Sequence, residues 1–278
     1  NRIEMAGLPR LFFVLFLFAL VTIPLLPFQV LAWKLERFWH KALPHWWQKF
    51  MCQLLGFRLH RHGNMATGRP LLIVANHVSW SDILVLGASG KVSFVAKSDM
   101  AAWPLFGLFA KLQRTIFIER EKRQNAGEQA AEIARRLRAG DALVLFPEGT
   151  TSDGNRVLPF KSSLFGAAKA VLEKGEPPFP DHVLIQPVAL AYNRVQGLPT
   201  GRYHRNIAAW PGSVGLVKHL KGVIAAGAVD VSIVFGEPVE FRLDTDRKVV
   251  AARLEREVRA MTAAALRFAP HETPSLEG

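Results

Sequence analysis

The sequence contains a single cysteine, Cys52, and this scarcity excludes a fold that depends on internal disulfides. Nothing in the cysteine usage therefore indicates an oxidising compartment. The histidine pairs His40/His45 and His60/His62 lack the cysteine partners that a structural zinc site of this spacing would have. We interpret these histidines as part of a basic surface, and we expect no metal site.

Motifs for several other kinds of chemistry are also absent or incomplete. The sequence has no Gly-x-Ser-x-Gly segment, so the serine elbow of a lipid hydrolase is missing. The run Gly87–Lys91 resembles a phosphate-binding loop, but position 85, where such a loop needs its first glycine, is Val85. No nucleic-acid-binding motif occurs either, although 35 Lys and Arg against 23 Asp and Glu favour a polyanionic partner. An anionic membrane is the remaining candidate for that partner.

Charge is absent from Leu11 to Trp33, a run that Arg10 precedes and Lys34 follows. As one straight helix this run would be about 34 Å long, enough to cross the ~30 Å hydrocarbon core of a bilayer. Pro24 and Pro27 each remove a backbone donor and crowd the preceding turn, and the part before them reaches only about 20 Å. Two arrangements stay open: a full span, and a helical hairpin that dips into one leaflet. A secretory signal is not indicated, because the run is long and no small-x-small cleavage site follows it.

The residues that follow have the pattern of an interfacial helix. Four of the seven tryptophans, Trp33, Trp39, Trp46 and Trp47, fall close together in the sequence. Apolar side chains recur here at helical spacing, and lysine and arginine occupy the other face. Tryptophan and lysine together suit a helix in the headgroup region, although an amphipathic helix on a soluble core has the same pattern. We predict that residues 1–56 form a membrane-anchoring helical segment.

From residue 57 onward the sequence alternates between strand and helix patterns, which predicts a catalytic domain at 57–270 and a frayed tail at 271–278. The expected strands are the apolar runs Leu71–Ala75, Val92–Ala96, Thr115–Ile118, Ala142–Phe146, Val183–Ala191 and Val229–Phe235. The expected helices are Gln124–Arg138, Phe160–Lys174 and Asp246–Phe268. This alternation favours an α/β fold with a mainly parallel central sheet flanked by helices.

A polar cluster follows the strand expected at Leu71–Ala75. His77 comes just after this strand, and Asp82 follows five residues later, near the opening of the next helix. A turn of this length can bring the two side chains together, so that one ring nitrogen donates to the carboxylate and the other stays free as a base. Strand ends of an open α/β sheet are where ligands usually bind. By itself the His-x4-Asp spacing is a weak signal, since both residues also serve as ordinary caps.

A second polar segment, Phe146–Thr150, coincides with the end of the strand expected at Ala142–Phe146. Gly149 allows a tight turn and exposes backbone amide donors. Glu148 is a carboxylate at a strand end, suited to bind hydroxyl groups. The alternative is a plain turn, because proline and glycine favour turns in any protein.

Taken together, these segments resemble the glycerolipid acyltransferase family, which includes the bacterial 1-acylglycerol-3-phosphate acyltransferases. The first family motif, Asn-His-x4-Asp, is matched at Asn76–Asp82, and Phe146–Thr150 looks like the third. Ile116–Arg120 looks like the second motif, whose arginine helps to hold the acceptor. Leu184–Val188 looks like the fourth, a proline-containing strand that lines the pocket. All four occur in family order, and no motif residue is missing, which disfavours a catalytically inactive membrane scaffold.

The resemblance implies a reaction and a set of site residues. His77 would take the proton from a lysolipid hydroxyl as it attacks a thioester carbonyl, and Asp82 would orient the ring and stabilise the imidazolium. Backbone amides near a helix start or Gly149 would stabilise the oxyanion. No acyl-enzyme, metal or cofactor is needed, and the co-substrate is acyl-CoA or acyl carrier protein. The residues expected to contact substrate are Asn76, Lys97, Arg120, Pro147, Glu148, Gly149, Thr150 and Pro187.

One departure from the family pattern concerns the acceptor. Phosphatidate-forming members often carry arginine after Gly-Thr, which suits a phosphate, whereas this sequence has Thr151. We expect a lysophospholipid such as 1-acylglycerol-3-phosphate, whose phosphate Lys97, Arg120, Arg156 or Lys161 would hold. The alternative acceptor is another lysolipid, such as lyso-ornithine lipid, because the longer run after Phe146 also resembles the relatives that acylate it.

The implied substrates also predict a location. A lysolipid lies in a leaflet, whereas acyl-CoA and acyl carrier protein are soluble, so the site must face the cytosol just above the headgroups. We expect the inner membrane of the cell, with the catalytic domain on its cytoplasmic face. The net charge of +12 would then serve docking to the bilayer, and also to an acidic carrier protein, rather than to nucleic acid.

Overall fold

The computed structural model describes residues 2–35, 39–118, 126–173, 181–212 and 214–267. Its strands are β1 Phe57–His62, β2 Leu71–Ala75, β3 Val92–Lys97, β4 Ile116–Ile118, β5 Ala142–Leu145, β6 Val183–Val195, β7 Leu198–Pro199, β8 Val229–Phe235 and β9 Val239–Phe241. They form one sheet in the order β1-β8-β6-β2-β5-β3-β4, with β7 and β9 also paired to β6. The strands from β6 to β4 run parallel, and β8 and β1 run antiparallel to them.

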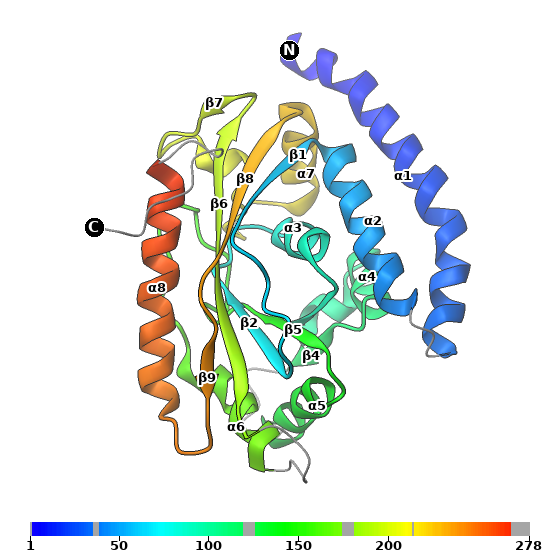
Figure 1. Cartoon of the computed structure of the whole chain (residues 1–278). Helices are drawn as coiled ribbons and strands as arrows, with labels where there is room; N and C mark the ends of the chain where they lie inside the picture. Colours follow the sequence, from blue (N-terminus) through cyan, green and yellow to red (C-terminus); the bar gives the residue numbers. More distant parts are fainter. Residues whose placement is uncertain (1, 36–38, 119–125, 174–180, 213, 268–278) are drawn as a thin grey trace.

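Helices cover both faces of this sheet (Figure 1). On one face lie α1 Arg2–Lys34, α2 Trp39–Leu55, α3 Asp82–Ser89, α4 Phe106–Leu112 and α7 Leu216–Ala226. On the other lie α5 Ala126–Arg138, α6 Gly166–Glu173 and α8 Arg247–Arg267. Short 3-10 turns occur at Ser98–Ala102, Ser162–Phe165 and Arg205–Ile207. Each helical layer has its own apolar cluster against the sheet.

The burial of the central strands explains their apolar sequence pattern. Every residue of β2 and of β5 is buried, because both strands have helices on each side. A strand in that position has no solvent face, so it is a continuous apolar run rather than an alternating one. The predicted α/β class, with a mainly parallel sheet flanked by helices, is confirmed.

Three strands were not predicted, namely β1, β7 and β9. The first is an edge strand, FRLHRH, in which basic residues alternate with apolar ones and only Phe57 is fully buried. An edge position tolerates charge that a central strand would not. His60, which we assigned to a basic surface, is instead largely buried, with its Nε2 atom 2.8 Å from Oδ1 of Asp230 on β8.

The first helix does not break at its prolines. α1 is continuous from Arg2 to Lys34 with Pro9, Pro24 and Pro27 inside it, so the expected interruption at Pro24 and Pro27 is wrong. The cost of a lost backbone hydrogen bond is tolerated when a helix is supported by neighbours, and in lipid a helical backbone is strongly favoured over an open one. The helical hairpin is present, but it consists of α1 followed by α2, which lie alongside each other (Figure 1).

α1 is docked on the rest of the protein near both of its ends. Near its start, Arg10 donates from Nε to the Ile224 carbonyl at 2.7 Å and from Nη2 to the Gly227 carbonyl at 2.9 Å, at the end of α7. Near its other end, Gln29 donates to the Leu112 carbonyl of α4 at 2.8 Å. Nineteen residues of helix separate the two anchors, or about 28 Å.

The opposite face of α1 is apolar and exposed. The segment Leu8–Lys34 has a mean hydropathy of 2.6 and is long and apolar enough to cross a membrane. Its large side chains that face outward are Phe12, Phe13, Leu15, Phe16, Leu20, Ile23, Phe28 and Leu31. An exposed apolar surface of this extent indicates association with a membrane.

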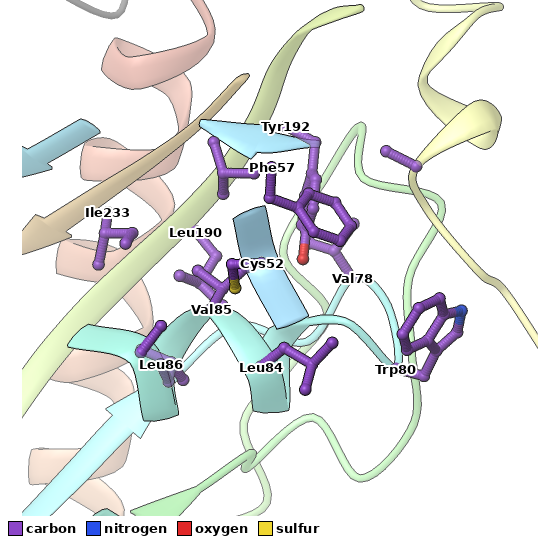
Figure 2. Packing of buried hydrophobic residues seen from close by; sticks show 14 of the residues in the cluster. Cys52, Phe57, Val78, Trp80, Leu84, Val85, Leu86, Leu190, Tyr192 and Ile233 are labelled. Carbon is purple, nitrogen blue, oxygen red and sulfur yellow. The ribbon is translucent and has the colours of Figure 1, made fainter. Parts of the chain in front are cut away.

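α2 connects this apolar helix with the core under the sheet. Met51, Cys52 and Leu55 on its last turns are buried in the same cluster as Val85 and Leu190 (Figure 2). α2 therefore packs as part of the domain that follows it. The division at residue 56 between a membrane-anchoring segment and a catalytic domain stays a prediction. The tail predicted at 271–278 lies outside the described residues.

Cys52 provides a test of this packing. Its side chain is 2% exposed, and burial raises the pKa of its thiol to about 12. At pH 8 the thiolate fraction is therefore very small, and we expect a maleimide to label the folded protein at least about 10²-fold more slowly than the denatured protein. Tyr203→Cys in the same chain is a matched control, because Tyr203 is exposed and a cysteine there should label rapidly. Fast labelling of Cys52 in the folded protein would show that α2 is not held in the core.

Candidate active site

The candidate site is built at the carboxyl ends of two neighbouring strands. β2 ends at Ala75 and is followed by Asn76 and His77, while β5 ends at Leu145 and is followed by Phe146–Thr150. The two strands are parallel and adjacent in register, so these polar segments emerge side by side at one edge of the sheet. A hydrogen bond of 2.8 Å from the Ser152 amide to the His77 carbonyl ties them together.

The structure brings His77 and Asp82 into contact. Nδ1 of the imidazole lies 2.8 Å from Oδ2 of the carboxylate, and Asp82 is the first residue of α3. A carboxylate only accepts, so the ring N–H is on Nδ1 and Nε2 has a free lone pair. The His77 side chain is 20% exposed, whereas Asp82 is completely buried. An imidazole that is oriented in this way and accessible to solvent can act as a general base.

Asp82 is held by more donors than His77 alone. Its Oδ2 atom also accepts from the backbone amides of Val78 at 2.7 Å and Ser79 at 3.0 Å. Its Oδ1 atom accepts from the Tyr192 hydroxyl at 2.7 Å, and that hydroxyl also contacts Ser81 at 2.8 Å. Tyr192 lies on β6 in the apolar cluster beside α3 (Figure 2). Each donor compensates the cost of burying the charge and fixes the carboxylate in one position.

The imidazole of His77 is also fixed by stacking. Its ring lies parallel to Phe146, with centroids 4.1 Å apart and an interplanar angle of 15°. Phe146 is itself buried and stacks on Phe94 of β3. The ring therefore has a hydrogen bond at one edge and an aromatic surface against one face.

Glu148 links the backbone of the site rather than pointing into open space. It is 3% exposed, and its Oε1 atom accepts from the His77 amide at 2.7 Å while Oε2 accepts from the Leu158 amide at 2.8 Å. Burial raises the pKa of this carboxyl to about 7, although the two amide donors oppose the shift. Both carboxylate oxygens are thus engaged within the protein, and the contact of Glu148 with an acceptor hydroxyl stays a prediction.

The rest of the motif forms the turn around Glu148. Pro147 is buried, and its carbonyl accepts from the Lys161 amide at 3.0 Å. Gly149 has a φ of 77°, a conformation that favours glycine, and its amide bonds back to the Phe146 carbonyl at 3.2 Å. Thr150 is exposed at the mouth of the site. The amide of Gly149 is therefore engaged within the turn, and stabilisation of an oxyanion by backbone amides near the start of α3 stays a prediction.

Two further predicted residues lie within the sheet. Asn76 is buried and forms two hydrogen bonds with the backbone of Leu190, donating to its carbonyl at 2.9 Å and accepting from its amide at 2.7 Å. It therefore holds the end of β2 to β6. Pro187 is buried in β6 opposite Val74, and its carbonyl accepts from Gly236 at 2.9 Å. A Cβ atom at Gly236 would meet Pro187 and Met261, so Pro187 lies toward α8, away from the His77 ring.

The predicted cationic residues lie farther out. Lys97 ends β3 at the same edge of the sheet, and its Nζ atom is 2.7 Å from Asp99. Arg156 lines a separate pocket beside the site, and Lys161 lies at the end of the loop that follows it. Arg120 lies outside the described residues. The described chain contains no group of three His, Cys, Asp or Glu side chains that could hold a metal, and the absence of a metal requirement stays a prediction.

Sequence reasoning missed three contributors to the site. Tyr192 is one of only two tyrosines in the chain and follows the apolar run Val188–Ala191 of β6, which is the one signal that could have indicated its role. Phe146 belongs to the third motif, but the sequence does not indicate that His77 stacks against its ring. The Leu158 amide could not have been found, because a backbone donor leaves no trace in the sequence.

The fold places the paired side chains of His77 and Asp82 at the strand ends of an α/β sheet, an arrangement that suits an enzyme with a general base. Comparison with known proteins identifies the family. The model of the Acyltransferase family matches residues 56–191. A lyso-ornithine lipid O-acyltransferase of Brucella abortus is 50% identical over 262 residues, which are 94% of this chain and 97% of that protein. The chain therefore belongs to the Acyltransferase family and is an enzyme that transfers acyl groups.

Two other relatives agree with this assignment. A 1-acyl-sn-glycerol-3-phosphate acyltransferase of Neisseria gonorrhoeae is 29% identical over 206 residues, 72% of this chain and 74% of that protein. The crystal structure of the 1-acyl-sn-glycerophosphate acyltransferase of Thermotoga maritima matches with a TM-score of 0.60 and 21% identity. That match covers 94% of this chain and 98% of the other, and it shows a shared fold.

The buried Glu148 predicts a pH-dependent stability. The pKa of this carboxyl is about 7 in the folded protein and 4.5 when the side chain is exposed, as in the unfolded protein. Between these pH values the folded state therefore binds a proton that the unfolded state has lost. The contribution of this carboxyl to stability is therefore greatest below pH 4.5 and falls, by about 3 kcal/mol at most, as pH rises through 7. Urea unfolding of the wild type and of Glu148→Gln from pH 4.5 to 8 measures this, because other titrating groups cancel in the difference. A difference that stays constant with pH would contradict the prediction.

Proposed function

We propose that this acyltransferase moves a fatty acyl group from a thioester donor to the free hydroxyl of a lysolipid, with His77 as the general base. The observation that carries the proposal is the 2.8 Å contact between Nδ1 of His77 and the buried carboxylate of Asp82, which directs Nε2 to the open side of the site. Relatives that act on lysolipids, at up to 50% identity, support the substrate class.

The reaction moves one proton from the hydroxyl to His77 and then from His77 to the leaving thiolate. Nε2 of His77 accepts the hydroxyl proton as the hydroxyl oxygen attacks the thioester carbon. The tetrahedral intermediate then expels the thiolate, which takes the proton from the imidazolium. Asp82 stabilises the imidazolium between these steps, and general-base catalysis of this kind contributes about 10² to 10⁴ in rate. Glu148 acts as a positioning residue, since it fixes the backbone of His77 through a 2.7 Å hydrogen bond.

We infer that the acceptor is lyso-ornithine lipid, with lysophosphatidate as the second candidate. Relatives named for lyso-ornithine lipid are 50% and 48% identical to this chain, whereas the 1-acyl-sn-glycerol-3-phosphate acyltransferases are 29% identical. Thr151 stands where phosphatidate-forming enzymes often carry arginine, which agrees with an acceptor that lacks phosphate.

The donor is acyl-CoA or acyl carrier protein, used as a co-substrate without a further cofactor. Both donors are anionic, and the net charge of +12 favours their approach as well as docking to an anionic bilayer. We propose no nucleic-acid partner, because the exposed aromatic residues gather on the apolar N-terminal helices.

We further propose that α1 lies in one leaflet rather than crossing the bilayer. Its two polar anchors, at Arg10 and Gln29, hold it against the folded domain along about 28 Å of helix. A helix that crossed the bilayer would carry that domain surface into the hydrocarbon core. In one leaflet, the exposed apolar face enters lipid while the catalytic domain stays in the cytosol, on the inner face of the inner membrane.

Replacement of the proposed base tests the mechanism. His77→Ala should lower kcat by about 10² to 10⁴, because the general base is removed. The protein should stay folded and bound to lipid, because the His77 side chain is partly exposed. Transfer of labelled acyl groups to lyso-ornithine lipid and to lysophosphatidate is the measurement. His182→Ala is a matched control, since His182 also forms an Nδ1 contact of 2.8 Å with an aspartate, Asp181, but at the surface. Retained activity in His77→Ala would remove His77 from this role.

Accessibility of single cysteines tests the position of α1. We would place them at Leu8 and at Leu35, near the two ends of α1, with Tyr203→Cys to report the side of the catalytic domain. A membrane-impermeant maleimide should label all three positions in inverted inner-membrane vesicles and none in intact cells. Labelling of the two helix ends from opposite sides would show a full span.

A further inference from the structure

A pocket that the reaction described above does not use lies beside the catalytic loop. Its volume is about 500 Å³, and it is lined by Asp153, Asn155, Arg156, Arg202 and Arg205. The first three residues follow the motif Phe146–Thr150, and the other two come from the loop around the 3-10 turn Arg205–Ile207. All five side chains are polar, and both signs of charge are present.

The pocket is directly connected to the backbone of His77. The Ser152 amide is 2.8 Å from the His77 carbonyl, and Asp153 is the next residue, so its Cα lies at most about 8 Å from that carbonyl. Gly154 packs on the residue after His77, because a Cβ atom there would be 3.2 Å from Cγ1 of Val78. A ligand in the pocket would therefore be near the reacting hydroxyl.

Asn155 organises the pocket by joining its two walls. Its Oδ1 atom accepts from Nη1 of Arg205 at 2.8 Å, and its Nδ2 atom donates to Asp153 at 3.1 Å and to the Arg202 carbonyl at 3.3 Å. This network holds the Asp153 carboxylate and the Arg205 guanidinium on one amide side chain. The two charged groups are thus set in position before any ligand binds.

Neither charged group is fully neutralised by this network. The Nε atom of Arg205 is buried and has no hydrogen-bond partner among the described residues. Burial lowers the pKa of Arg205, the charge of Asp153 opposes this shift, and the charge of Arg202 adds to it. Burial opposes ionisation of Asp153, but hydrogen bonds from Asn155 and the charge of Arg156 outweigh it and lower its pKa. The pocket therefore has an unpaired donor on Arg205 and an ionised acceptor on Asp153.

We propose that this pocket binds the zwitterionic headgroup of an amino-acid lysolipid, with Arg205 on the carboxylate and Asp153 on the ammonium group. Arg202 is placed to share the carboxylate with Arg205. The proposal rests on the proposed function, since it takes lyso-ornithine lipid as the acceptor. A guanidinium binds a carboxylate through two parallel hydrogen bonds, and an ammonium group needs an acceptor such as Asp153.

The dimensions of the lipid fit this arrangement. Six bonds separate the acceptor oxygen, on the third carbon of the acyl chain, from the carboxylate carbon of ornithine, which is a reach of about 7 Å. The ammonium group extends about 3 to 4 Å farther. In a glycerophosphate the phosphorus is only about 5 Å from the free hydroxyl, which is a shorter reach than that of the ornithine carboxylate.

A combination of variants and acceptor analogues tests the assignment. The full-length protein in detergent micelles would receive one labelled acyl-CoA and three acceptors: lyso-ornithine lipid, its norvaline analogue without the ammonium group, and its carboxamide without the carboxylate. Asp153→Asn should lower kcat/KM for lyso-ornithine lipid about 10- to 100-fold, and for the norvaline analogue less than about twofold. Arg205→Gln should also lower kcat/KM for lyso-ornithine lipid about 10- to 100-fold, and for the carboxamide less than about twofold.

Matched controls separate this effect from a general loss of charge. Asp181→Asn and Arg242→Gln remove the same kinds of charge from an exposed ion pair elsewhere and should leave all three acceptors unaffected. Thermal unfolding of each variant reports whether the fold is retained, and Arg205→Lys, which keeps the charge, should lose less than Arg205→Gln.

Several outcomes would overturn the assignment. Unchanged kinetics in Asp153→Asn and Arg205→Gln, or equal losses with every acceptor, would remove the headgroup from this pocket while the acyltransferase function stands. A raised KM for acyl-CoA alone in Arg205→Gln would assign the pocket to the donor instead. If the wild type transfers to lysophosphatidate but not to lyso-ornithine lipid, the headgroup proposal fails while acyl transfer stands. If it transfers to neither lipid, the proposed function fails as well.

Discussion

The buried carboxylate of Asp82 is the constraint on which the site depends. A charge with no exposure to solvent is stable only if its hydrogen-bonding capacity is satisfied, because the desolvation penalty is several kcal/mol. Four donors satisfy it: two backbone amides of its own loop, the His77 ring and the Tyr192 hydroxyl. Because those donors converge on one carboxylate, they hold the loop and the Nδ1 edge of the His77 ring together.

A second buried carboxylate extends this constraint to the neighbouring strand. Glu148 accepts from the amides of His77 and Leu158, so the loops after β2 and β5 form one unit. Asn76 adds β6 to that unit through the Leu190 backbone, and β6 carries Tyr192 back to Asp82. The ends of β2, β5 and β6 are therefore joined by one network of hydrogen bonds. This network explains how a partly exposed imidazole can be held in a single orientation.

The same rigidity relates the site to the membrane. α2 has its last turns in the core with Cys52 and Leu55, and α1 is fixed to α7 and α4 by Arg10 and Gln29. The apolar helix is thus packed on the catalytic domain. The height of His77 above the lipid is then set by packing, which suits a reaction between a soluble thioester and a lipid held in a leaflet.

The sequence by itself determined the central strands, the α/β class and the pairing of His77 with Asp82. These features are local: buried strands are apolar runs, and only four residues separate His77 from Asp82 in the sequence. Only the tertiary structure decided the partners of the two carboxylates, since Tyr192 is 110 residues from Asp82 and the donors to Glu148 are backbone amides. It also decided that α1 continues through Pro24 and Pro27, because neighbouring helices support a backbone that an isolated segment would break. Local propensity fixes short-range geometry, whereas burial and long-range hydrogen bonds depend on which distant segments the fold brings together.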